Sequence, residues 1–314
     1  MQNTAGIHHI SAMVNDAQRN IDFYAGVLGL RLVKKTINFD RPEVYHLYFG
    51  NETGQPGTVI TFFPWAKQLK GRIGTGQVGV ISYIIPKGSA HFWENRLRKF
   101  GVEFTSSNRF GETYLKFNDP DGLQLELTER EEGPTNTWDF GRVQAENAIK
   151  GFGGAVLFSA QPHKTTDVLE NILGLECMGQ EKEFLRFKSE GPLGNTIDIH
   201  LNPSVRGLMG AGTVHHIAWR AKDDEDHQRW RSLLLEKGYY PTEILDRNYF
   251  KALYFHEGGG ILFEIATDPP GFSADEPVTG LGKKLMLPSW LESEREKLEE
   301  TLPHVEVRVL EGDK

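Results

Sequence analysis

Four short apolar runs along the chain each precede a stretch with helical spacing. Each run has the length and apolar character of a strand that is buried in a sheet. The runs begin at Ile7, Val78, Phe152 and Val214. The stretch after each run repeats apolar residues every three or four positions, as the inner face of an amphipathic helix does. Each helical stretch ends at a glycine, and these glycines are Gly29, Gly101, Gly174 and Gly238.

The first helical stretch illustrates the local chemistry. Asn15 or Asp16 can cap its start, because their side chains accept hydrogen bonds from backbone N–H groups that have no partner within the helix. Gly29 can end it in the left-handed conformation that other residues resist. The apolar face between these ends consists of Ile21, Tyr24, Ala25 and Leu28. We therefore predict a helix that ends at Gly29.

About three further strands are predicted after each helix, so that the order βαβββ occurs four times. The polar stretch at residues 129–137 divides the four modules two and two. We predict an α+β fold in which four βαβββ modules form cupped mixed sheets in two two-module halves. The expected segments are an N-terminal half at 1–130 (modules at about 7–65 and 78–129), a linker at 131–150, a C-terminal half at 151–270 (modules at about 152–202 and 214–267) and a C-terminal extension with a helix at 271–314.

Composition narrows the class of protein. The net charge of −8 argues against a nucleic-acid-binding protein, which needs clustered positive charge. No apolar run approaches the roughly 20 residues of a membrane span, and no signal peptide is visible. The single cysteine, Cys177, cannot form an internal disulfide, and we predict that it packs in the interior. These features predict a cytoplasmic protein without nucleic-acid or membrane partners.

Two of the four first strands carry adjacent histidines. The stretch "GIHHISAMV" holds His8 and His9, and "TVHHIAWRA" holds His215 and His216. Because neighbours on a regular strand point to opposite faces, only one histidine of each pair is expected to face a given pocket. The last strands of three modules offer the carboxylates Glu126, Asp198 and Glu264. The fourth module alone joins a histidine on its first strand with a carboxylate on its last strand.

The order of elements resembles the vicinal oxygen chelate superfamily over about residues 6–267. The resemblance implies that metal ligands come from the first and last strands of modules, which lie side by side in a cup. Two histidines and one carboxylate leave about three coordination positions open, the arrangement of non-haem Fe(II) oxygenases. The last strand of the first module, "TVITFF", has no carboxylate, whereas a glyoxalase-type site would require a fourth ligand. The resemblance therefore favours oxygen chemistry.

Within that superfamily the chain is most similar to ring-cleaving dioxygenases that act on hydroquinones, whose iron lies between the first and fourth modules. The resemblance implies a metal, Fe(II) or alternatively Mn(II), bound by His9, His216 and Glu264. It also implies residues behind the ligands or near the metal and substrate, namely His8, His215, Tyr254, Arg247 and Ser11. Ser11 stands where relatives have Thr, a change that keeps the hydroxyl. The expected activity is opening of a hydroquinone ring with O₂.

Other functions stay open at this stage. A catechol extradiol dioxygenase would carry a histidine on the first strand of the third module, where "FGGAVLFS" has none. A glyoxalase-like isomerase would need a fourth ligand, and a metal-free protein that binds aromatic compounds would have lost the ligands. Glu126 and Asp198 are interpreted as structural carboxylates. Expected partners are a small aromatic substrate and O₂, and the sequence is compatible with a homo-oligomer.

Overall fold

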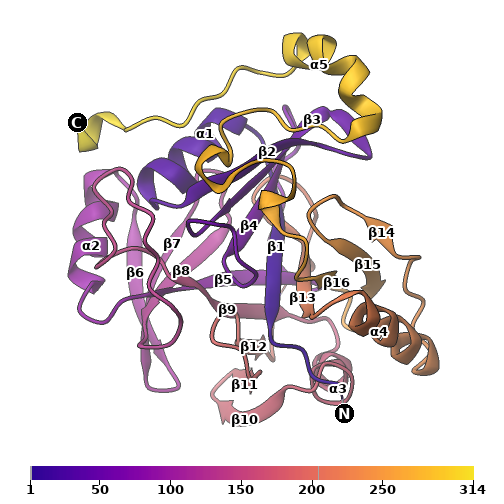
Figure 1. Cartoon of the computed structure of the whole chain (residues 1–314). Coiled ribbons are helices and arrows are strands. Elements are labelled where there is room, and N and C mark those ends of the chain that lie inside the picture. The colour runs from indigo at the N-terminus through magenta and orange to yellow at the C-terminus, as the bar shows by residue number, and fades with distance from the viewer. Residues whose placement is uncertain (1, 204) are drawn as a thin grey trace.

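The computed structural model describes residues 2–203 and 205–314, whose strands form two eight-stranded sheets (Figure 1). The strand order is β14-β15-β16-β13-β1-β4-β3-β2 in the first sheet and β10-β11-β12-β9-β5-β8-β7-β6 in the second. The first sheet combines the first and fourth predicted modules, and the second sheet combines the second and third. Each sheet therefore takes strands from both halves of the sequence, and the predicted α+β fold with mixed sheets is confirmed.

The strands of both sheets have the following bounds. The first sheet contains β1 (Ile7–Val14), β2 (Arg31–Asn38), β3 (Arg41–Gly50), β4 (Val59–Pro64), β13 (Thr213–Ala221), β14 (Leu245–Asp246), β15 (Lys251–His256) and β16 (Leu262–Thr267). The second contains β5 (Gln77–Ile85), β6 (Phe104–Arg109), β7 (Glu112–Asn118), β8 (Gln124–Glu129), β9 (Gly151–Phe158), β10 (Glu176–Glu181), β11 (Phe184–Lys188) and β12 (Thr196–His200).

The first strands of two modules form the middle of each sheet. β1 pairs antiparallel with β13, and β5 pairs antiparallel with β9. The last strand of each module runs parallel to its own first strand, as β4 does beside β1 and β16 beside β13. Side chains from the first and last strands of two different modules are thereby brought together at the centre of one sheet.

The helices lie where the apolar spacing predicts them. Asp16 caps the first one, because its side chain accepts a hydrogen bond from the backbone N–H of Arg19. This helix widens from α-helical (α1, Ala17–Ile21) to π-helical geometry over Asp22–Val27, and Gly29 follows with a φ of 68°. The remaining α-helices are α2 (Ala90–Lys99), α3 (Pro162–Asn171), α4 (Asp224–Glu236) and α5 (Arg295–Thr301).

The C-terminal extension runs across the first module, as the yellow segment of Figure 1 shows. Its leucines Leu285, Leu287 and Leu298 are buried in the main hydrophobic core. It also covers Lys34 of β2, which is fully buried and forms ion pairs with Asp275 at 2.7 Å and Glu276 at 2.5 Å. A buried ammonium group needs such partners, so the extension stabilises the outer part of the first sheet.

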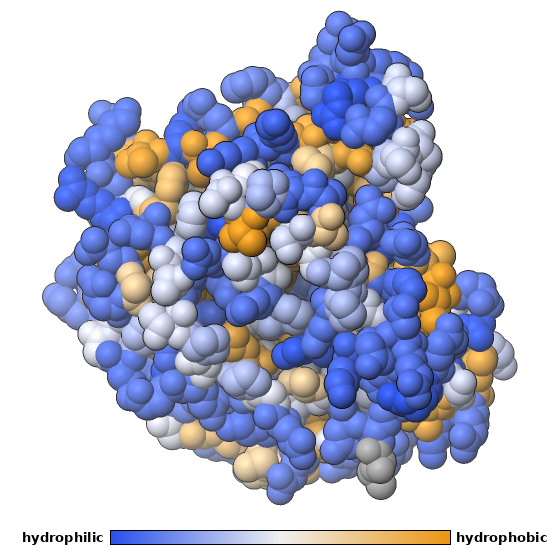
Figure 2. Space-filling view, in the orientation of Figure 1, coloured by the Kyte–Doolittle hydropathy of each residue, from blue (hydrophilic) through white to orange (hydrophobic). Residues whose placement is uncertain are grey.

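The face of the molecule in Figure 2 is mostly hydrophilic, with hydrophobic residues scattered among charged ones. The prediction that Cys177 packs in the interior is wrong, since it is exposed. The reason is that β10 is an edge strand of the second sheet, where several side chains face solvent. Within the described ranges no helix has both the length and the apolar character needed to cross a bilayer.

Candidate metal centre

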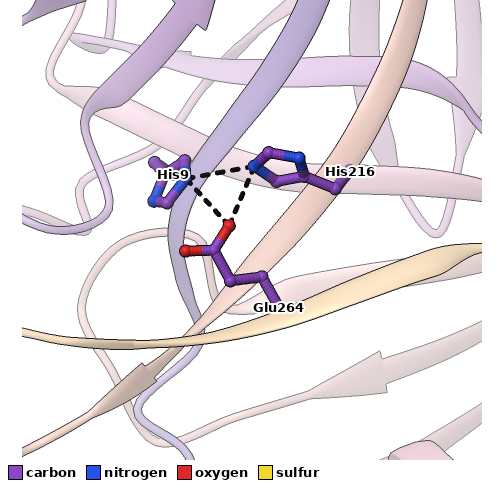
Figure 3. A group of neighbouring side chains, drawn as sticks. All are labelled: His9, His216 and Glu264. Atoms are coloured by element: carbon purple, nitrogen blue, oxygen red, sulfur yellow. Dashed lines mark hydrogen bonds and ion pairs between the residues drawn. The ribbon is translucent and has the colours of Figure 1, made fainter. Parts of the chain in front are cut away.

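Three side chains from neighbouring strands of the first sheet converge on one point (Figure 3). His9 comes from β1, His216 from β13 and Glu264 from β16. The Nε2 atoms of the two histidines are 3.3 Å apart, and they lie 3.4 Å (His9) and 2.9 Å (His216) from Oε2 of Glu264. Among the residues described, this is the one cluster of at least three His, Cys, Asp or Glu side chains with ligand atoms this close.

The strand register explains why these residues meet. Ala218 of β13 lies between His9 of β1 on one side and Glu264 of β16 on the other, so the three residues form a row across the strands. His216 is two residues before Ala218 and points to the same face. Sequence positions more than two hundred residues apart are thus joined by two adjacent strand pairings.

The chemistry of the cluster fits a divalent cation. Glu264 is fully buried, and neither carboxylate oxygen has a hydrogen-bond donor. Burial opposes ionisation of this carboxyl unless a positive charge lies beside it. Burial lowers the pKa of His216, which favours the neutral imidazole with a lone pair on Nε2. A buried carboxylate beside such imidazoles needs a positive charge, and a metal ion supplies it.

Each histidine of the cluster is in contact with its neighbour in the sequence. Nδ1 of His8 lies 2.9 Å from Nδ1 of His9, and Nδ1 of His215 lies 2.8 Å from Nδ1 of His216. A hydrogen bond on Nδ1 fixes the ring orientation and leaves Nε2 free for the metal, which is the usual arrangement around metal-binding histidines. The geometry therefore matches the division of each pair that the resemblance implies.

The expectation that only one histidine of a pair faces a given pocket is wrong for the second pair, whereas in the first pair His9 lines the cavity and His8 does not. The β1–β13 ladder contains two register shifts, one between Ile7 and His9 and one between Ser11 and Ala12. His8 is the extra residue at the first shift, and His215, on the partner strand, is the extra residue at the second. Such bulges rotate the strand locally. Consequently His215 lines the same cavity as His216.

A cavity of about 530 Å³ opens beside the cluster, and three of the other predicted residues line it, namely His215, Tyr254 and Arg247. Tyr254 of β15 pairs with Glu264 in the sheet, and its ring centre lies 5.5 Å from that of His216. The guanidinium of Arg247 lies 5.8 Å from the centre of the Tyr254 ring and is paired with Asp40 at 3.5 Å. Both residues are therefore located where a bound substrate could contact them.

Ser11 lies on β1 two residues after His9 and is fully buried. Its hydroxyl forms a 2.7 Å hydrogen bond with the hydroxyl of Thr61 on β4. Ser11 is absent from the cavity lining, so its contact with the site passes through Thr61.

Several cavity residues were missed by sequence reasoning. His46 and Tyr48 of β3 and Phe250 line the cavity with the predicted residues. The alternation in "YHLYF" puts His46 and Tyr48 on one face of a strand, which was the available signal. The sequence did not show that this face of β3 points into the cavity beside the cluster of His9, His216 and Glu264.

Glu126 and Asp198 belong to a different arrangement in the second sheet. Both are buried, and the guanidinium of Arg109 lies between them, with Nη1 3.0 Å from Glu126 and Nε 2.6 Å from Asp198. By register, the residues that correspond to His216 and His9 are Val80 and Gly154. The second cup thus holds a fixed organic cation between its carboxylates, which supports the structural interpretation of Glu126 and Asp198.

The chain is similar to known proteins along nearly its whole length. A sequence model of the "Glyoxalase/Bleomycin resistance protein/Dioxygenase superfamily" matches residues 6–127 and 151–273. The Bacillus subtilis (strain 168) protein named "Putative ring-cleaving dioxygenase MhqO" is 61% identical over 308 residues, which cover 98% of this chain and 99% of the relative. The "Chlorohydroquinone/hydroquinone 1,2-dioxygenase" of Sphingobium indicum is 33% identical, covering 95% of each chain.

A crystal structure of a Bacillus subtilis protein has the same fold throughout. It superimposes with a TM-score of 0.98 at 60% identity, covering 99% of this chain and 100% of that chain. The two-sheet arrangement described above is therefore that of an experimentally determined relative.

Proposed function

Because the chain belongs to the Glyoxalase/Bleomycin resistance protein/Dioxygenase superfamily, we propose that it is an Fe(II)-dependent dioxygenase that opens hydroquinone-type aromatic rings with O₂. The observation that carries the proposal is the cluster of two histidines and one carboxylate beside a cavity. A set of three protein ligands leaves room for both a phenolate and O₂. The name of the Sphingobium relative supports hydroquinones as the substrate class.

In this proposal His9, His216 and Glu264 hold the metal, and Mn(II) is the alternative occupant. When bound, Fe(II) supplies the redox chemistry that lets a phenolate react with O₂. His8 and His215 keep the ligand imidazoles in place through their Nδ1 contacts. Glu264 is fully buried, so its carboxylate is screened from bulk water.

The surrounding side chains orient the substrate and control protons. Burial and the nearby Glu264 carboxylate raise the pKa of Tyr254, so its phenol stays protonated and can donate a hydrogen bond. Burial and the neighbouring His216 lower the pKa of His215 to about 4, so its imidazole is neutral and its Nδ1 can accept the hydrogen bond from Nδ1–H of His216. Arg247 adds a positive charge that favours a substrate phenolate. Aromatic walls from Phe63, Trp65 and Phe250 suit a flat ring.

Oxygen consumption tests the proposal directly. The protein is purified without air, loaded with Fe(II) and mixed with O₂ and either methylhydroquinone or catechol. We expect uptake of O₂ and loss of the aromatic absorbance with methylhydroquinone. No uptake with any hydroquinone despite bound iron would refute the proposal, and preference for catechol would favour the catechol extradiol alternative.

The same Fe(II)-loaded protein distinguishes the proposed dioxygenase from two further alternative functions. A glyoxalase-like isomerase would act on a thiol adduct without consuming O₂. A metal-free protein that binds aromatic compounds would bind methylhydroquinone equally well after treatment with a chelator. The proposal also includes a cytoplasmic location, which cell fractionation tests. A homo-oligomer is also compatible with the proposal, and light scattering measures the oligomeric state.

A further inference from the structure

A chain of four polar side chains lies on the first-module side of the cup. The phenol oxygen of Tyr48 is 2.8 Å from Nδ1 of His46, and Nε2 of His46 is 2.8 Å from the hydroxyl of Thr61. The Thr61 hydroxyl in turn is 2.7 Å from that of Ser11. His46 and Tyr48 both line the cavity that contains the metal ligands. None of the roles proposed above uses His46, Thr61 or Tyr48.

The strand register gives Tyr48 a defined position opposite Tyr254. Tyr48 pairs with Thr61 on the neighbouring strand, just as Tyr254 pairs with Glu264. The cup thus has one tyrosine on each side. Tyr254 lies beside the carboxylate ligand, whereas Tyr48 lies beyond Thr61, on the side that contributes no carboxylate.

Both hydrogen-bonding positions of the His46 ring are occupied, so His46 can orient Tyr48 but is not free to bind the substrate itself. Both ring nitrogens have hydrogen-bond partners, and the ring is packed 4.0 Å from the Tyr48 ring and 4.3 Å from the Phe63 ring, measured between centres. Tyr48 itself makes one hydrogen bond, to His46, and burial raises the pKa of its phenol well above the usual range. Its oxygen consequently has capacity for a further hydrogen bond while the proton is retained.

The shape of a hydroquinone requires a second polar partner in the cavity, besides the metal. Its two hydroxyls are at opposite ends of the ring, so when one oxygen binds the metal the other points away from it. A catechol has both hydroxyls on the same side, and both can reach the metal. A buried hydroxyl without a hydrogen bond is costly, so the remote hydroxyl needs a polar group in the cavity lining that is not a metal ligand, and Tyr48 is such a group.

We propose that Tyr48 binds the hydroquinone hydroxyl that does not bind the metal, and that His46 is the positioning residue that orients it. This inference rests on the proposed function, because it assumes a hydroquinone in the cavity. The Thr61 and Ser11 hydroxyls can each rotate, so the chain supports Tyr48 as either donor or acceptor. The same arrangement distinguishes a hydroquinone from a phenol, which lacks the remote hydroxyl.

Anaerobic calorimetry of the metal-loaded protein tests the inference without turnover. Hydroquinone, phenol and catechol are titrated into the wild type and Tyr48→Phe. We expect wild type to bind hydroquinone more tightly than phenol, and Tyr48→Phe to weaken hydroquinone binding about tenfold while phenol and catechol change less than twofold. The matched control is Tyr45→Phe, since the Tyr45 phenol on the same strand bonds the Pro303 carbonyl outside the cavity.

The role of His46 has its own signature. His46→Phe should reproduce the loss of preference for hydroquinone over phenol, and His46→Gln, which keeps a hydrogen-bonding group, should restore part of it. Combining His46→Phe with Tyr48→Phe should add little beyond either change, because both remove the same hydrogen bond. Metal content and melting temperature are recorded for each variant to identify any that fails to fold.

The outcomes separate this inference from the proposed function. Equal weakening of phenol and hydroquinone by Tyr48→Phe, or an unchanged preference for hydroquinone, would overturn the inference even if the wild type consumes O₂ with hydroquinones. A wild type that does not distinguish hydroquinone from phenol would overturn it as well. Loss of the preference in Tyr48→Phe without any O₂ uptake by the wild type would support the inference and refute the dioxygenase proposal.

Discussion

Thr61 of β4 occupies the register position that Glu264 occupies on β16. Thr61 pairs with Ser11 of β1, and Glu264 pairs with Ala218 of β13. The two ligand histidines lie two residues before these partners on their own strands. The two modules are therefore equivalent in the backbone, and they differ in the side chain at the fourth ligand position. In the proposed site, a hydroxyl here would leave the metal with three protein ligands.

Placing a carboxylate at that position should give the proposed metal site a fourth protein ligand. Thr61→Glu is expected to keep the metal but to abolish ring cleavage, because a fourth protein ligand fills a position that the substrate or O₂ requires. The longer side chain in a packed interior should also cost about 1–3 kcal/mol of unfolding free energy. Metal content and O₂ uptake are measured together, with Thr61→Val as the control that adds no ligand. Full activity in Thr61→Glu would show that this position does not face the metal.

The two buried glutamates should respond oppositely to substitution. Glu264→Ala removes a metal ligand, so we expect loss of both bound metal and activity. Glu126→Gln should keep metal and activity, because the Glu126 carboxylate bonds Arg109 in the other sheet. It should nevertheless lower the unfolding free energy by about 3–5 kcal/mol, since it breaks a buried ion pair. Elemental analysis and thermal unfolding distinguish the two effects, and metal loss in Glu126→Gln would contradict this assignment.

The supporting histidines should affect metal affinity without being ligands. His215→Phe removes the Nδ1 contact to His216, and His8→Phe removes the one to His9. We expect each change to weaken metal binding or activity about 10- to 100-fold. Competition with a chromogenic chelator measures the affinity. His256→Ala, at the exposed last residue of β15, serves as the control, and affinities equal to wild type in both Phe variants would rule out this supporting role.

Stability in acid should depend on Glu112 of the second sheet. Burial would raise its pKa, but hydrogen bonds and charge from Arg130, with Arg186 nearby, lower it to about 2 from 4.5. The folded state therefore binds fewer protons than the unfolded state between these values. The contribution of Glu112 is complete above pH 4.5 and is lost as the pH falls toward 2.

Urea unfolding of wild type and Glu112→Gln measures this effect. We expect the wild type to be more stable at pH 6 and the two unfolding free energies to converge as the pH decreases through the range from 4.5 to 2. A constant difference across that range would mean that the Arg130 and Arg186 contacts do not depend on ionised Glu112.

Local patterns in the sequence were sufficient for the repeated module. Apolar alternation, the capping Asp16 and the terminating Gly29 act within a few residues, so their outcome follows from neighbouring positions. The resemblance then brought together His9, His216 and Glu264, and the geometry of the cluster agrees with a shared metal. These features depend on residue type and on spacing along the chain.

The tertiary structure decided everything that depends on which strands pair and in which register. Pairing of β1 with β13 created the bulges that turn His8 and His215 toward their neighbours, against the parity expected of a regular strand. Pairing of β3 with β4 placed Tyr48 beside Thr61 in the lining of the cavity, whereas in the second sheet Arg109 lies between two carboxylates. Register is set by contacts between residues far apart in sequence, so a local pattern cannot encode a one-residue shift.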